Sequence, residues 1–317
     1  MNVWRLHTNT AGGYIGDYCF AKNVAAIGWC LRHYKSDIQS GKKTVKHFVD
    51  FEKFAIKSQG KDASSRGISQ VKKLSCEIKA NDLIWMRHAG IYYIGRVEGN
   101  SIYDYDFSDT AYNKDACNQL TNIFWQKVGD EDAVAGAISS AFNGRGRTLQ
   151  KINSITPEYS KFVYDKVSGK NIYNVVNLGS GKTLEEKRNI FFNLLHYYDL
   201  EDLVCMYLYF HNQFVAIPST NKTSTPLYEC VLLDTKTGKN IYIQTKMNSD
   251  IDANNYKNLS KSGDVYLCSA LKSVQNLQKV SSNIQKILPE GLYDFATAKR
   301  LKNFIPKRIS DYVDLIG

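Results

Sequence analysis

Hydrophobic and polar positions alternate with period two in two short runs of the C-terminal half. The runs "YECVLLD" (228–234) and "NIYIQTK" (240–246) are rich in β-branched and aromatic residues, which favour strands. The loop between them, "TKTG", contains Gly238, a residue that takes a positive φ without steric cost. The pattern predicts one β-hairpin.

The register of this hairpin brings three polar side chains together. If Asp234 faces Lys239 across the loop, then Glu229 lies opposite Gln244. Gln244 and Lys246 share a face because side chains alternate, and Glu229 points to the same face. The same face also carries the apolar residues Val231, Leu233 and Tyr242. One interpretation is a solvated face with a Glu–Lys pair, and the other is a partly buried site that binds a metal.

The order of an acid, a hairpin turn and "QTK" resembles the PD-(D/E)xK nucleases in their Mrr-like restriction branch. Upstream, "LEDLVCMYLYFHNQFVAIPST" (200–220) is similar to the first helix and first strand of that family, with a glutamate at Glu201. Downstream, "DVYLCSA" (264–270) is similar to a further core strand. The resemblance covers roughly residues 184–315 and implies an α/β restriction-endonuclease-like core.

The resemblance also implies Mg²⁺- or Mn²⁺-dependent hydrolysis of a phosphodiester. Glu229 and Glu201 would then bind the metal through carboxylates, and Gln244 through its amide oxygen. Lys246 would stabilise developing charge or position the attacking water. The catalytic residues implied are Glu229, Gln244, Lys246 and Glu201. Glutamate stands where the family usually has aspartate, and Gln244 lowers the negative charge, so an inactive nuclease fold remains an alternative.

The N-terminal half shows a different pattern, with short apolar strands separated by polar segments. The run "KANDLIWMRHAGIYYIGRVEG" (79–99) predicts a tight hairpin with "HAG" at its turn, and a long helical and basic segment precedes it. The pieces "WRLHTN", "GDYCFAKN", "AAIGW" and "AFNGRGRTLQKI", together with this hairpin, resemble PUA-like domains of the EVE type. The resemblance implies a β-barrel with inserted helices.

Such domains bind modified or flipped bases in an aromatic pocket, because a base stacks well on an aromatic ring. We expect Trp29 and Trp85 to form the pocket walls, with Trp4 a weaker candidate, and each tryptophan has barrel core as its alternative. Asn9 and Asp37 are candidates for reading a base edge.

Two arginines in "NGRGRT" are candidates for phosphate contact, since the neighbouring glycines allow close backbone approach. These residues are Arg145 and Arg147, and a solvated turn is the alternative.

The fold class predicted for the whole chain is α+β with two domains. The first spans residues 1–152, a polar linker spans 153–183, and the second spans 184–317. We expect Thr183 to cap the first helix of the second domain, ahead of an acidic first turn. The "GSGK" at residues 179–182 lacks the spacing of a phosphate-binding loop.

Composition favours a polyanion as the partner. The chain of 317 residues has a formal net charge of +10, which suits neutralisation of phosphates. No apolar run reaches the roughly 20 residues that span a bilayer, and no secretion signal is recognisable. Seven scattered cysteines without a CxxC pair favour a reduced cytoplasmic setting and argue against structural zinc.

These patterns together predict a modification-dependent DNA endonuclease of the restriction or anti-phage type. Its expected partner is double-stranded DNA carrying a modified base. We expect no membrane partner, and we expect a homodimer to form on the DNA. The alternatives are a catalytically inactive nucleic-acid reader and a nuclease directed at RNA.

Overall fold

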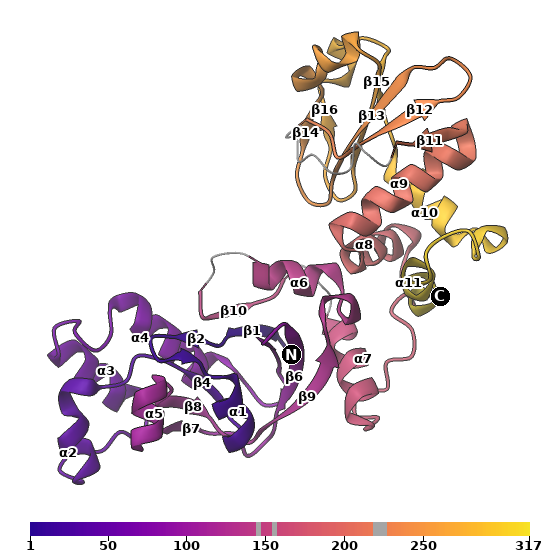
Figure 1. Cartoon of the computed structure of the whole chain (residues 1–317). Coiled ribbons are helices and arrows are strands. Elements are labelled where there is room, and N and C mark those ends of the chain that lie inside the picture. Colours follow the sequence, from indigo (N-terminus) through magenta and orange to yellow (C-terminus); the bar gives the residue numbers. More distant parts are fainter. Residues whose placement is uncertain (144–146, 154–156, 218–226) are drawn as a thin grey trace. The chain divides into compact units, whose positions relative to one another are not determined.

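The structure is a computed structural model that describes residues 1–143, 147–153, 157–217 and 227–317. It divides into two compact units, which are described separately (Figure 1). The N-terminal unit comprises residues 1–134 and 138–175, and the C-terminal unit comprises residues 135–137 and 176–317.

The N-terminal unit is built on a five-stranded sheet of order β10-β1-β5-β6-β9. In chain order its strands are β1 Val3–His7, β5 Leu83–His88, β6 Ile91–Val97, β9 Ile123–Gly129 and β10 Leu149–Lys151. The β1 strand runs parallel to β5, whereas β10, β6 and β9 each join a neighbour antiparallel. The expected hairpin is confirmed as β5–β6, and its turn places Ala89 and Gly90 at φ values of 49° and 80°.

Smaller strands and several helices complete this unit. A three-stranded sheet of order β4-β8-β7 contains β4 Ala25–Ile27, β7 Tyr103–Tyr105 and β8 Asn118–Leu120, and β2 Asn9–Thr10 pairs with β3 Gly13–Tyr14. The helices are α1 Gly16–Lys22, α2 Lys35–Gln39, α3 Phe48–Lys57, α4 Ser65–Lys72, α5 Asp109–Lys114 and α7 Pro157–Ser168, and α6 Gly136–Asn143 begins in the other unit. The described strands of the N-terminal unit form no closed barrel, so α+β is confirmed while the predicted barrel is not.

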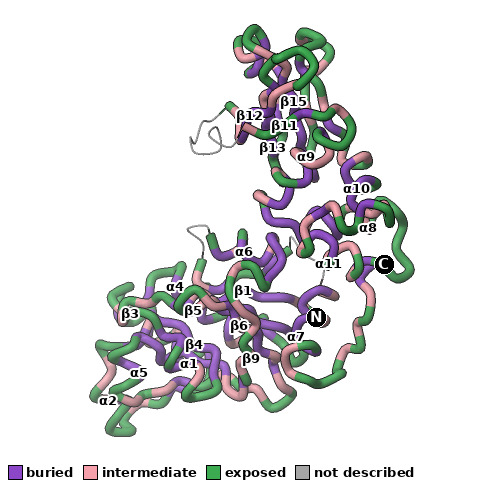
Figure 2. The backbone as a smooth tube through the Cα atoms, turned by 45° about the vertical axis from the view of Figure 1, so that its right-hand side comes forward, coloured by how far each residue is buried: buried purple, intermediate pink, exposed green. Residues whose placement is uncertain are grey.

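The core of the N-terminal unit lies against both faces of β5. Leu83, Ile84, Trp85 and Met86 are all fully buried, and in Figure 2 the buried trace runs along β1 and β6. Helix α7 packs on β6 and β9. The predicted linker 153–183 is therefore wrong over the described residues of this helix, which have a packed apolar face instead of a solvated one.

The C-terminal unit contains a second five-stranded sheet, of order β11-β12-β13-β15-β17. Its strands are β11 Phe214–Ala216, β12 Cys230–Asp234, β13 Asn240–Lys246, β15 Asp264–Ser269 and β17 Ile284–Lys286. Strand β12 is antiparallel to both neighbours, and β13, β15 and β17 are parallel to one another. A short parallel pair joins β14 Ile251–Asp252 to β16 Val274–Gln275.

The described residues of this unit also form the helices α8 Leu184–Leu194, α9 Tyr197–Asn212, α10 Pro289–Thr297 and α11 Lys307–Ile316. Helix α9 buries a stripe of Leu200, Leu203, Val204 and Leu208, whose spacing matches one face of a helix. That face packs against β11 and β13.

The predicted cap of α8 is confirmed. The Thr183 side chain accepts a hydrogen bond from the Glu186 backbone N–H at 3.2 Å, and the Glu186 carboxylate accepts one from the Thr183 N–H at 2.8 Å. Two of the backbone donors left unpaired at the start of the helix are thereby satisfied.

Replacing Thr183 by alanine is expected to lower the free energy of unfolding by about 1 kcal/mol, because an N-cap side chain contributes roughly 0.5–2 kcal/mol. Urea denaturation of the wild type and of Thr183→Ala measures the difference, with exposed Ser180→Ala as the surface control. A loss in Thr183→Ala no larger than in the control would contradict the cap's contribution.

Candidate functional site

The hairpin β12–β13 has the predicted register. Cys230 pairs with Ile243 and Leu233 with Asn240, which sets Glu229, the residue before β12, beside Gln244. The Gln244 Nε2 donates a hydrogen bond to Glu229 Oε1 at 2.6 Å. Lys246 Nζ donates to the same oxygen at 3.2 Å. The three polar side chains therefore meet at one carboxylate.

The exposure of these three side chains increases from the interior of the unit to its surface. Gln244 is 1% exposed, whereas the side chains of Glu229 and Lys246 are 28% and 45% exposed. Val231 on the same face is also buried, so the interpretation of a solvated face is wrong for Gln244 and Val231. A ligand can therefore reach Lys246 while Gln244 holds the carboxylate from within.

The buried amide of Gln244 is only half satisfied. Its Nε2 donates to Glu229 and also to the Thr245 carbonyl oxygen at 3.1 Å. Its Oε1 is buried and has no hydrogen-bond partner among the described residues. Since an unpartnered buried acceptor is costly, this oxygen is a candidate ligand atom for a cation.

Helix α9 brings a second carboxylate to the cluster. Cys205 of this helix lies 3.4 Å, Sγ to Sγ, from Cys230 of β12, and Glu201 lies one helical turn before it. Burial, and then the Glu229 and Asp202 carboxylates, raise the pKa of Glu201 to about 7, while Lys246 acts in the opposite direction. The Glu201 and Glu229 carboxylates therefore interact electrostatically, and the metal-binding role expected for Glu201 stays a prediction.

One neighbour of the cluster was not predicted from the sequence. Tyr256 is buried, and its phenol pKa is raised first by burial and then by the Glu229 carboxylate. It lies ten residues beyond Lys246 at the end of a short 3-10 helix, Ala253–Tyr256, which is too short to show a periodic pattern in the sequence.

The donor set suits a hard divalent cation. Glu201 and Glu229 offer carboxylate oxygens, and Gln244 Oε1 offers an amide oxygen without a partner. No group of three or more His, Cys, Asp or Glu side chains within metal-binding reach occurs in the described part of the chain. A bound Mg²⁺ would accordingly keep several water ligands, as this ion commonly does.

The raised pKa of Glu201 predicts a pH-dependent effect on stability in metal-free protein. A carboxyl with a higher pKa in the folded state than in the unfolded state binds more protons when folded, so its contribution is present below pH 4.5 and is lost as the pH rises through about 7. Glu201→Gln is therefore expected to gain stability relative to the wild type at pH 8 but not at pH 4.5. Urea denaturation in EDTA at both pH values tests this, and an equal difference at the two would contradict it.

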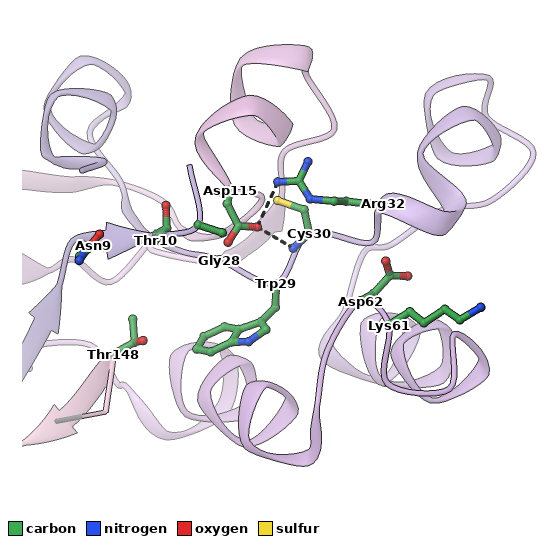
Figure 3. Close-up of a pocket in the computed structure, with 11 residues that line it drawn as sticks. Asn9, Thr10, Gly28, Trp29, Cys30, Arg32, Lys61, Asp62, Asp115 and Thr148 are labelled. Carbon is green, nitrogen blue, oxygen red and sulfur yellow. Dashed lines mark hydrogen bonds and ion pairs between the residues drawn. The ribbon is translucent and has the colours of Figure 1, made fainter. Parts of the chain in front are cut away.

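A pocket of about 390 Å³ opens in the N-terminal unit, and Figure 3 shows the residues around it. Its lining includes Asn9, Thr10, Trp29, Asp62, Asp115 and Thr148. These residues come from loops and strand ends far apart in the sequence, and the Trp29 indole lies between Thr148 and Asp62 in this view. We call this cavity the Trp29 pocket.

The backbone at Trp29 is held in a conformation that bulky residues rarely adopt. Its φ is 65°, and such strain persists only where the surroundings enforce it. A Cβ on Gly28 would lie 2.3 Å from the Asp115 carboxylate, and one on Gly67 would lie 2.6 Å from the indole. Glycine at both positions lets the loop and helix α4 close on the tryptophan.

Two carboxylates line the Trp29 pocket with different degrees of pairing. Asp115 accepts a hydrogen bond from the Cys30 N–H at 3.2 Å and faces Arg32 at 3.7 Å. The Asp62 side chain is 1% exposed, and its Oδ1 lies 2.8 Å from His33 Nδ1. The Oδ2 of Asp62 has no partner among the described residues, so it is available to a donor in the pocket.

The structure corrects the other two predicted pocket walls. Trp4 and Trp85 are fully buried, and each indole N–H is used internally. Trp4 Nε1 donates to Asp82 at 2.9 Å, and Trp85 Nε1 donates to Ser160 of α7 at 3.0 Å. Neither ring presents a free face, so both belong to the core.

The other residues predicted to contact nucleic acid are Asn9, Asp37, Arg145 and Arg147. Asn9 lines the Trp29 pocket, whereas Asp37 on α2 is half-buried, is bonded to Lys43 and does not line it. The fold therefore does not place Asp37 where it could contact a base at Trp29. Arg147 is exposed, with its carbonyl accepting a hydrogen bond from Arg5 at 2.7 Å, and Arg145 lies outside the described residues.

The cysteine pattern also differs from the prediction, because a disulfide joins Cys30 to Cys117 with their Cα atoms 5.3 Å apart. The two residues are 87 positions apart in sequence, so spacing gave no indication of the pair. Cys30 lines the Trp29 pocket, and the bond fixes the loop after Trp29 to strand β8.

One comparison with known families gave a match. Residues 4–153 match a family described as a domain of unknown function (DUF8426). The matched region contains the whole lining of the Trp29 pocket. No curated protein and no solved structure matches the chain.

Over the described residues, no helix combines the length and the apolar character that crossing a bilayer requires.

Proposed function

We propose that this chain is a metal-dependent endonuclease that acts on double-stranded DNA carrying a modified base. In this proposal the C-terminal unit hydrolyses the phosphodiester and the N-terminal unit holds the base in the Trp29 pocket. The observation that carries the proposal is the convergence of Gln244 and Lys246 on Glu229, with Glu201 coupled to the same carboxylate.

The order of elements around this site supports the proposal. Helix α9, strand β11, the hairpin β12–β13 and strand β15 follow one another, and the four strands are neighbours in one sheet. This is the order that the resemblance to Mrr-like PD-(D/E)xK nucleases implies. Fold likeness alone does not establish activity, so the argument rests on the side chains.

The residues of the site divide the chemical work. Glu229, Glu201 and the Gln244 amide oxygen would hold Mg²⁺ or Mn²⁺, which supplies a more acidic water and offsets phosphate charge when bound. Gln244 orients the Glu229 carboxylate through its 2.6 Å hydrogen bond. Glu201 has a pKa of about 7 in the metal-free protein, so it can lose its proton near neutral pH and then bind the cation.

Lys246 occupies the position suited to electrostatic stabilisation. Its ammonium is held by Glu229 at 3.2 Å, and nearly half of the side chain is exposed. A scissile phosphate approaching the open end of the cluster would therefore meet a positive charge that is already oriented. Such preorganised charge lowers the barrier because little reorganisation is needed during reaction.

The Trp29 pocket has the size and chemistry for one flipped base. Its volume of about 390 Å³ lies within the usual range for small-ligand sites, and an indole face stacks on any base. The unpartnered Asp62 Oδ2 can accept a hydrogen bond from a base amino or imino group.

The charge of the chain supports a nucleic-acid partner, because +10 attracts a polyanion. Each chain carries one such site among the described residues. Cutting both strands thus calls for two copies, and we propose a homodimer formed on DNA. Sedimentation with and without substrate tests the dimer, and a monomeric complex that makes double-strand breaks would contradict it.

The experiment that tests the function uses duplex DNAs with unmodified, methylated, hydroxymethylated or glucosylated cytosine, each incubated with Mg²⁺ and with EDTA. The proposal expects cleavage of only some modified substrates, lost in EDTA. Binding without cleavage would favour an inactive reader, and preference for an RNA of the same sequence would favour an RNA-directed enzyme.

A further inference from the structure

A second cavity, of about 520 Å³, opens beside the Trp29 pocket in the N-terminal unit. It lies where β1 and β5 end, and its lining includes His7, Asn9, Tyr14, Arg87, His88 and Phe142. Asn9 lines both cavities, so they are adjacent. No aspartate or glutamate belongs to this lining. We call this cavity the Arg87 pocket.

Two imidazoles of the Arg87 pocket have buried nitrogen atoms without partners. His7 Nε2 and His88 Nδ1 have no hydrogen-bond partner among the described residues. The other nitrogen of His88, Nε2, lies 3.2 Å from an Asp17 carboxylate oxygen, which fixes the ring. The Nδ1 edge of His88 packs on Gly16, whereas the unpartnered Nε2 of His7 in the lining of an open cavity points to a ligand that supplies the missing hydrogen bond.

The charge of the pocket comes from Arg87. Its guanidinium lies 5.3 Å from the centre of the Tyr92 ring and 3.9 Å from a Glu131 carboxylate oxygen. About a third of the side chain is exposed, so the guanidinium remains accessible from the cavity. A guanidinium with neighbouring imidazoles is a donor set that suits a phosphate group.

The two pockets together define a ligand. The Trp29 pocket offers a stacking ring and an unpartnered carboxylate oxygen, which suit a base with N–H donors. The Arg87 pocket offers donors and positive charge, which suit an anion. Because Asn9 lies on the boundary, a single molecule with a base and a nearby anionic group can occupy both.

We propose that one nucleotide occupies the two pockets, with its base against Trp29 and its phosphate against Arg87 and His7. The inference rests on the part of the proposed function that places a base at Trp29, and it does not depend on cleavage. Burial, followed by the charge of Arg5, lowers the pKa of His7 to about 4, so His7 serves as a neutral imidazole near pH 7.

The test measures binding by calorimetry to the full-length chain. The probes are the nucleosides and the 5′-monophosphates of the four standard DNA bases, of 5-methylcytosine and of 5-hydroxymethylcytosine. For the base that binds best, the wild type is expected to hold the monophosphate about tenfold more tightly than the nucleoside. No binding of any probe, or equal binding of nucleoside and monophosphate, would overturn the proposal.

The variants separate the two pockets. Arg87→Gln is expected to remove the phosphate preference while leaving nucleoside affinity unchanged, and Trp29→Ala is expected to weaken both probes by the same factor. His7→Asn, a second variant in case Arg87→Gln does not fold, should also lose affinity for the monophosphate only. Lys57→Gln, an exposed cation on α3 that lines neither pocket, is the charge-matched control. Equal losses in Arg87→Gln and Lys57→Gln would refute the phosphate subsite.

A free nucleotide and a nucleotide within a DNA strand carry the same chemistry. A single-stranded hexamer containing the preferred base separates these sources: tighter binding than the monophosphate indicates a strand, and weaker binding indicates a free nucleotide. A cleavage assay distinguishes this proposal from the proposed nuclease activity. If cleavage depends on Lys246 but the monophosphate binds no better than the nucleoside, only the two-pocket nucleotide site is refuted. A phosphate preference without cleavage refutes only the nuclease.

Discussion

Lys246→Ala is expected to cleave modified DNA roughly 10²–10³-fold more slowly than the wild type, because one preorganised charge is removed from the transition state. The side chain is partly exposed and contributes a single ion pair to Glu229, so the fold should tolerate the change. DNA affinity is expected to change little, because binding draws on many cations across the chain.

Lys236→Ala is the matched control. Lys236 is exposed in the loop of the same hairpin, and its substitution removes the same charge. Single-turnover cleavage of the preferred substrate compares the three proteins. A Lys246→Ala rate within about threefold of the control, or a loss of cleavage that follows a loss of DNA binding, would contradict the role given to this residue.

Trp29→Ala is expected to weaken binding of modified duplex by about 1–3 kcal/mol, roughly 5- to 150-fold, because base stacking on an aromatic ring contributes that much. Binding of unmodified duplex should change far less, since it depends on phosphate contacts. Trp29→Phe keeps a stacking ring and should retain most of the discrimination. Competition binding at one fixed salt concentration measures both affinities.

Phe124→Ala is the control for this prediction, because Phe124 is an exposed aromatic residue of the same unit and is 49% exposed. Equal losses for modified and unmodified duplex in Trp29→Ala would contradict a base-specific role. So would a Trp29→Ala protein that unfolds under the assay conditions, and near-ultraviolet circular dichroism checks for that.

The hairpin and the helix cap could be predicted from sequence because their physics is local. The period of a strand and the length of the loop set the pairing of Glu229 with Gln244, and three residues suffice to recognise the Thr183 cap. Glu201 could be placed near the hairpin because helical spacing puts it one turn from Cys205. The raised pKa of Glu201 could not be predicted from the sequence, since it depends on burial in the folded unit.

The Trp29 pocket could be predicted only in part because it depends on long-range packing. Asp62 and Asp115 lie in loops with no periodic pattern, and they meet Trp29 only when the sheets assemble. Composition cannot distinguish a tryptophan that lines a pocket from one that fills a core. Trp85 is buried with its indole bonded to Ser160 of α7, a helix that lies within the segment predicted from the sequence as a linker.

The most direct measurement of the central claim is the cleavage of an equimolar pool of DNAs with unmodified, methylated, hydroxymethylated and glucosylated cytosine by the wild type and by Glu229→Gln. Both proteins are assayed in Mg²⁺ and in EDTA, with circular dichroism to confirm folding. The account predicts cleavage of at least one component by the wild type in Mg²⁺ alone, and none by Glu229→Gln. Cleavage that survives in Glu229→Gln or in EDTA, or a wild type that binds the pool and never cuts it, would contradict it.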